Sequence, residues 1–196
     1  MATVDVIANV GDTLISLLRA AFAPAAPGED VPIVDPSNVV TAEPGEFSKY
    51  NNQLNRAVTI FLYHVSITSE VRNAPRRTLD GGKTTRPLLP LTLRYLITPW
   101  SRDARSSAMI AGRIMQKLYD KAELGPSDLQ GDSWAQGDSV QVIFDPLPVQ
   151  DHYNIWDPTE LPYRLSLTYL VRVIGLEPAV QVSEAPVVTA TLKGAP

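Results

Sequence analysis

The segment at residues 87–98, PLLPLTLRYLIT, limits the possible folds of this chain more than any other segment. Every second position from residue 89 is apolar, which predicts one buried face made of Leu89, Leu91, Leu93, Tyr95 and Ile97. Thr92, Arg94 and Thr98 fill the polar positions between them, so the period of two indicates a β-strand with one face in a core. A one-residue shift would expose all five apolar side chains, which fixes the register. Proline at position 90 predicts that pairing begins near Leu91.

Length and composition describe one ordinary globular domain. The chain has 196 residues, of which 44% are apolar and 19% charged, and a net charge of −4. This negative charge gives no general indication of nucleic-acid or acidic-membrane binding. The absence of cysteine excludes disulfides and thiolate metal sites. The apolar run at 4–22 is interrupted by charges and lacks a basic leader, so we expect neither a signal peptide nor direct membrane insertion, and synthesis in the cytoplasm.

Helical periodicity appears twice. Residues 4–22 predict an amphipathic helix with a buried stripe of Ile7, Val10, Leu14, Leu17, Leu18 and Ala21. Residues 101–121 predict a second helix, capped by Ser101 or Asp103 and stopped by the LeuGlyPro at 124–126. Its predicted buried stripe is Ala104, Ala108, Ala111, Met115 and Leu118, and a close approach to its support is expected at Ala108 and Gly112.

Further strands are predicted on both sides of the 87–98 segment. Residues 56–67 are apolar on both faces, which indicates a central strand, and a wide hairpin turning at Gly81-Gly82 would join them to 87–98. Strands are also predicted at 139–144 and at 163–174, the latter with an apolar face of Leu165, Leu167, Tyr169, Val171 and Val173. Asp157 is expected to cap a short helical turn at 157–160. The long connection at 24–50 and the tail are each predicted to carry an edge strand, at 31–34 and 186–192 respectively.

These elements predict an α+β fold: a single domain with a mixed, mostly antiparallel sheet and two main helices packed on it. The domain is expected to span residues 1–177 and to be followed by a Pro/Ala-rich tail at 178–196.

Catalytic patterns are absent from the sequence. His64 lies inside a predicted strand and is expected to be a core histidine, whereas His152 lies in a predicted loop; two such isolated histidines do not indicate a metal site. The GGKTT at 81–85 lacks the first glycine of a phosphate-binding loop and precedes a strand, so we expect no nucleotide there. The remaining candidate for an enzyme or ligand-binding cleft is formed by Asp151, His152 and Tyr153. We therefore expect no catalytic residues, no cofactor and no metal.

Charge is segregated along the chain. Residues 68–121 hold eleven basic and four acidic side chains, and residues 122–163 hold eight acidic and no basic ones. The two segments could neutralise each other within one subunit. Alternatively, a head-to-tail contact could place the basic loop against an acidic neighbouring subunit through Arg72, Arg76, Arg77, Lys83 and Arg86. The loop lacks interleaved aromatic residues, which disfavours nucleic acid as its partner.

Several segments in order resemble the cap, or tail-terminator, proteins of phage-tail-like contractile injection systems. They are LISLL near the N-terminus, IFLYHV at 60–65, VRN at 71–73, LPLTLRYLIT at 89–98, AGRIMQKLYD at 111–120 and YRLSLTYLVRVI at 163–174. The resemblance spans residues 5–177 and implies a structural protein. It implies a homo-hexameric ring that ends the inner tube and anchors the last sheath layer, with tube and sheath proteins as partners and no catalytic residue.

Charge complementarity in such a ring could also involve Arg94 and Arg172 on the polar side of the outer strands. Two alternatives remain from the residues alone: a tube or sheath subunit of the same kind of particle, and a small enzyme or ligand-binding domain. After assembly in the cytoplasm the protein would be part of the particle. The residues do not decide whether that particle is released, membrane-anchored or retained.

Overall fold

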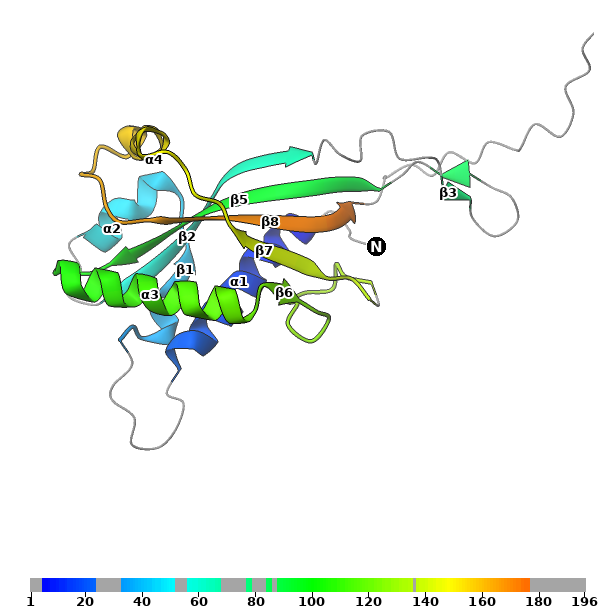
Figure 1. The fold of residues 1–196 in the computed structure, drawn as a ribbon, viewed down its shortest axis with the longest axis horizontal. Coiled ribbons are helices and arrows are strands. Elements are labelled where there is room, and N and C mark those ends of the chain that lie inside the picture. The colour runs from blue at the N-terminus through cyan, green and yellow to red at the C-terminus, as the bar shows by residue number, and fades with distance from the viewer. Residues whose placement is uncertain are drawn as a thin grey trace, which may run out of the picture.

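The computed structural model describes residues 5–23, 33–51, 56–67, 77–78, 84–85, 88–135 and 137–176. One six-stranded sheet in the order β1-β2-β5-β8-β7-β6 forms the centre, with helices on both faces (Figure 1). Its strands are β1 (Val39–Thr41), β2 (Ala57–Ile67), β5 (Leu89–Trp100), β6 (Glu123–Leu124), β7 (Val140–Phe144) and β8 (Leu167–Leu176). The α-helices are α1 (Val6–Phe22), α2 (Phe47–Asn51), α3 (Ala104–Asp120) and α4 (Val149–Trp156). The predicted α+β class with a mixed sheet is confirmed.

Strands β2, β5 and β8 form the antiparallel centre of the sheet. The ladder between β2 and β5 runs from Ala57 opposite Trp100 to Ile67 opposite Leu91, which confirms the hairpin and, for this ladder, the start of pairing at Leu91. With β8, pairing already begins at Leu89 opposite Leu176, and Leu89 is 40% exposed, so its predicted burial is wrong. The turn of the hairpin at Gly81-Gly82 lies outside the described residues. On either side of these glycines in the sequence, β3 (Arg77–Thr78) pairs with β4 (Thr84–Thr85) in a separate two-stranded ladder. Figure 1 shows β3 beyond the end of β5, away from the helices.

The edge of the sheet differs from the prediction. The edge strand is β1, which pairs parallel to β2 with Val39 opposite Val58. Ile33 and Val34 lie in a bend, so an edge strand at 31–34 is wrong for these two residues, and 31–32 lie outside the described part. The 24–50 connection is also structured: η1 (Pro36–Asn38), β1, η2 (Pro44–Glu46) and the start of α2 lie in it. Pro36 and Pro44 begin the two 3₁₀ turns, where a missing N–H costs nothing.

The larger core lies between the sheet and helices α1 and α3. The predicted stripe of α1 is confirmed, with Val10, Leu14 and Leu18 at most 1% exposed, except at Ile7, which is only half-buried. Asp103 caps α3 by accepting from the Ser106 backbone N–H at 2.7 Å, as one of the two predicted caps.

The predicted stripe of α3 is wrong in part. The buried residues of α3 are Ser106, Ile110, Ala111, Ile114 and Leu118. The predicted Ala104, Ala108 and Met115 are exposed, because turning the helix toward its two isoleucines buries more apolar surface than turning it toward alanines. Gly112 is exposed with open space around it, so no close approach occurs there. The helix ends at Asp120, before the LeuGlyPro that was expected to stop it.

A second, aromatic core covers the opposite face of the sheet under α2 and α4. Its buried members are Ala42, Phe47, Ala57, Leu96, Trp100 and Trp156. The Trp100 and Trp156 rings lie 6.0 Å apart, and each lies within 5.7 Å of the Phe47 ring. Arg164 closes this core from outside: its guanidinium lies 5.4 Å from the Trp100 ring and donates to Asn51 Oδ1 at 2.6 and 3.1 Å.

The segment before β8 also differs from the prediction. Helix α4 was not anticipated, and the turn after it, η4 (Asp157–Thr159), follows Trp156 directly, so Asp157 is its first residue and not its cap. The last strand begins at Leu167 instead of 163, and Leu165 is 43% exposed. The predicted tail with its edge strand at 186–192 lies outside the described residues.

Candidate functional site

The structure shows where most of the residues considered for catalysis lie. His64 is exposed on β2, so the expectation of a core histidine is wrong. The bulge at Tyr63 shifts the register of β2 there, and the outer end of the strand extends beyond the helices that cover its inner half. Thr84 and Thr85 of the GGKTT segment lie in β4, not at the start of a helix, which is incompatible with a phosphate-binding loop.

His152 and Tyr153 belong to an aromatic cluster on α4. The His152 ring meets Tyr163 edge-on at 6.5 Å, and the Tyr153 ring lies 4.7 Å from the same tyrosine. Burial lowers the pKa of His152 below its usual range, and the nearby Asp151 opposes this shift. The lowered pKa favours the neutral imidazole, and the ring contacts pack both side chains against Tyr163.

Charged residues lie on the outer half of the sheet face that carries the aromatic core. By register, His64, Arg94, Leu170 and Ile143 form one row across β2, β5, β8 and β7. Arg94 forms an ion pair with Asp145 at 3.1 Å, next to the buried Tyr63 hydroxyl. Burial first, and then the Asp145 charge, raises the pKa of Tyr63. Arg94 is thus already paired within the chain.

Two ion pairs join the basic segment to the acidic one. Arg94 pairs with Asp145, and Lys121 pairs with Asp128 at 3.1 Å. The first partner in each pair belongs to residues 68–121 and the second to 122–163. Neutralisation within the subunit therefore occurs at these two positions of the described chain.

The structure brings together only part of the predicted interface set. Arg172 is exposed on the same sheet face as Arg94, opposite Thr92 of β5 and Gln141 of β7. The backbone of Arg77 lies in β3. Four residues of the set lie outside the described part: Arg72, Arg76, Lys83 and Arg86.

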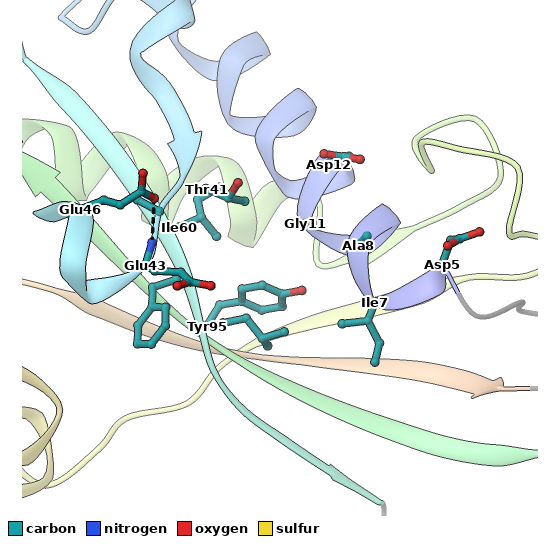
Figure 2. A pocket seen from close by; sticks show the side chains of 13 residues that line it. Asp5, Ile7, Ala8, Gly11, Asp12, Thr41, Glu43, Glu46, Ile60 and Tyr95 are labelled. Carbon is teal, nitrogen blue, oxygen red and sulfur yellow. Dashed lines mark hydrogen bonds between the residues drawn. The ribbon is translucent and has the colours of Figure 1, made fainter.

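An acidic groove of about 730 Å³ opens between α1, η2 and strands β1 and β2 (Figure 2). Its rim carries four carboxylates, from Asp5, Asp12, Glu43 and Glu46, and the described residues that line it include no Lys, Arg or His. The floor is apolar and includes Ile60, Phe61, Leu62 and Tyr95. Sequence reasoning missed this groove, because its acidic residues come from two segments about thirty residues apart.

The four carboxylates differ in how they are held. Glu46 accepts from Lys49 Nζ at 2.8 Å and from the Glu43 backbone N–H at 3.3 Å, and the first of these bonds lowers the pKa of Glu46. Among the described residues, Asp5, Asp12 and Glu43 form no ion pair. The rim thus presents unneutralised negative charge.

Tyr95 gives the groove a polar group on its floor. The residue is 2% exposed, and its hydroxyl has no hydrogen-bond partner in the described structure. In Figure 2 the hydroxyl points across the groove toward α1. Burial, assisted by the charge of Asp12, raises the pKa of Tyr95, so the phenol stays neutral. A buried hydroxyl left without a partner costs stability, unless a ligand supplies one.

The described residues contain no group of three or more His, Cys, Asp or Glu side chains that could hold a metal ion. In the same residues, none of the helices combines the length and the apolarity that a membrane crossing requires.

Comparison with known proteins identifies the family of this chain. Residues 9–190 match the family of the Pvc16 N-terminal domain. The chain belongs to this family. No curated protein matches its sequence.

Two solved structures share the fold of this Pvc16 N-terminal domain. The first is the sheath/tube terminator, in the extended state, of PVC, an extracellular contractile injection system; it matches 97% of this chain with a TM-score of 0.60 and 20% identity. The second is the tube-terminating cap of the anti-feeding prophage; it matches 94% of this chain with a TM-score of 0.56 and 21% identity. The matched part covers 64% of the first structure and 60% of the second, so the chain spans less than two thirds of either.

Proposed function

We propose that this protein is a structural cap of a contractile injection system, which ends the inner tube and anchors the last layer of the sheath. The observation that carries the proposal is family membership over residues 9–190, together with a fold shared with a sheath/tube terminator and a tube-terminating cap. Tube and sheath proteins are then its partners. Its work is binding and not catalysis, and it acts as part of the particle after synthesis in the cytoplasm.

The proposed assembly is a homo-hexameric ring formed by head-to-tail contacts. A head-to-tail contact uses two different surfaces of the subunit, and it closes into a ring when the rotation between neighbours divides a full turn. The predicted basic surface of Arg72, Arg76, Arg77, Lys83 and Arg86 supplies one of these surfaces. Arg172, exposed on the sheet, adds positive charge that a partner can meet. We also propose that residues 1–177 form the domain that makes these contacts and that residues 178–196 form a tail.

The test uses the purified protein together with the tube and sheath proteins of the same particle. We expect closed rings of six subunits in electron micrographs, and tubes that stop elongating when the protein is added. The triple substitution Arg72→Glu, Arg76→Glu and Arg77→Glu should abolish rings or tube termination. The control is Arg102→Glu with Arg105→Glu, at exposed positions just before and in the first turn of α3, and it should leave both unchanged.

Open-ended polymers of the purified protein would instead identify a tube or sheath subunit. A monomer that leaves tube elongation unaffected would overturn the proposed function.

A further inference from the structure

We propose that the acidic groove between α1, η2, β1 and β2 receives the basic 72–86 segment of a second copy of this chain. This inference rests on the proposed ring and names the surface that would accept the basic segment. The groove and the segment are the two unlike surfaces that a head-to-tail contact needs.

The first argument is charge complementarity. Among the described residues, the lining of the groove has four carboxylates and no cationic side chain. Residues 72–86 carry five cationic side chains and a single acidic one, Asp80. Opposite charges on two surfaces guide the encounter and exclude wrong partners, and they fix the register of the contact.

The second argument is the shape and chemistry of the groove. An apolar floor accommodates the methylene stem of an arginine or lysine while the rim carboxylates bind its charged end. Arginine has five N–H donors and no acceptor, so it matches a site whose free groups are carboxylates. The Tyr95 oxygen on the floor can accept one further N–H, which would satisfy its unpartnered hydroxyl.

The third argument is direction. The basic segment follows Ile67 at the outer end of β2, whereas the groove floor is formed five to seven residues earlier, at Ile60–Leu62. At about 3.3 Å per residue this separation is roughly 17–23 Å along the strand. Figure 1 shows β3, which contains Arg77, still farther from the body of the domain. β3 thus lies away from the groove of its own subunit, on the side where a neighbouring subunit can meet it.

The test uses two complementary charge variants of the full chain. The groove variant carries Asp12→Lys and Glu43→Lys. The arm variant, named for the basic 72–86 segment, carries Arg76→Glu and Arg77→Glu. Each variant alone opposes like charges at the contact, so we expect its self-association, measured by mass photometry, to be weaker than wild type by at least about tenfold. Mixed together, each variant offers a surface that fits the other, and alternating rings should form. Circular dichroism confirms the folding of each variant.

The matched control is Asp120→Lys with Glu123→Lys, which makes the same charge change at exposed positions outside the groove. Its association should equal that of wild type. Added salt should weaken the wild-type association, because exposed charges are screened.

Tyr95→Phe provides a readout that does not change the charge. It removes a buried hydroxyl without a partner, so the stability of the isolated subunit should be kept or increased. Association should weaken about two- to tenfold, because the bond to the incoming cation is lost. The opposite signs of these effects separate a binding role from a packing role.

Rings formed by the groove variant alone would overturn this inference and leave the proposed cap function standing. Failure of the mixed variants to assemble would also overturn it, since a groove filled by the arm of its own subunit predicts that result. If wild type forms no ring and does not stop tube growth, the proposed function fails instead.

Discussion

Phe47 joins the two tryptophans of the second core, and we expect its loss to destabilise the domain strongly. It is the first residue of α2 and is 1% exposed, and its ring meets Phe61, Trp100 and Trp156 at centroid distances of 6.0, 5.6 and 5.7 Å. Replacing a buried phenylalanine by alanine costs about 3–5 kcal/mol. Each lost aromatic pair adds about 0.5–1.5 kcal/mol beyond buried area, which favours the upper end of that range. A domain with about 5–15 kcal/mol in total would lose a large part of its stability.

The matched control is Phe144→Ala, the same chemical change at the end of β7. Phe144 is 45% exposed and has one ring neighbour, Tyr169, at 5.5 Å. We expect a loss of about 1 kcal/mol there, because roughly half of the side chain already contacts solvent. Urea unfolding followed by tryptophan fluorescence and circular dichroism, at one protein concentration, measures both variants. Equal losses for Phe47→Ala and Phe144→Ala would refute the role assigned to the aromatic core.

Three further predictions concern pH, the ion pair on the sheet and backbone conformation. Burial lowers the folded-state pKa of His152, so the stability that the neutral imidazole provides should be full above the ordinary pKa of 6.5 and should fall as the pH decreases below it. His152→Phe should reduce the difference between the melting temperatures at pH 7.5 and pH 5.5. A double-mutant cycle of Arg94→Ala and Asp145→Asn should give a coupling of about 0.5–1 kcal/mol, and zero coupling would remove the ion pair as a stabilising contact. Gly137→Ala should lower the free energy of unfolding by about 1 kcal/mol, because φ is +89° at this position. Gly131→Ala should lower it by at least about 1 kcal/mol more, because the new Cβ would also lie 2.5 Å from the Asn9 side chain. Equal losses in urea denaturation would exclude that clash.

The central sheet was predictable because its strands carry their own pattern. The alternation from Leu91 to Ile97 and the apolar inner half of 56–67 determine the register and the position in the sheet, and these parts agree with the structure. The predicted faces are wrong at their outer ends, where Leu89, Val65 and Ile67 are 40–45% exposed. Helix α1 was predictable for the same reason. In α3 the stripe was misjudged, since counting alanines as apolar ignored the larger gain from burying Ile110 and Ile114.

The second core was not predictable from periodicity. Helix α2 spans five residues and α4 eight, too short for a clear helical period, and each is held by aromatic contacts to distant strands. The acidic groove was missed for a related reason. Asp12 and Glu43 become neighbours only because β1 pairs parallel to β2 beside α1, and this tertiary arrangement has no local signal.

The place of β8 in the sheet has a consequence for biogenesis. This strand follows all the other described strands in sequence, yet it lies between β5 and β7. While the ribosome is still making residues before Leu167, β5 and β7 each present an unpaired edge, of the kind that invites intermolecular aggregation. Translational pausing in that interval, or a stop codon there, would therefore yield aggregation-prone fragments, and only a polypeptide that has passed Leu176 can complete its sheet.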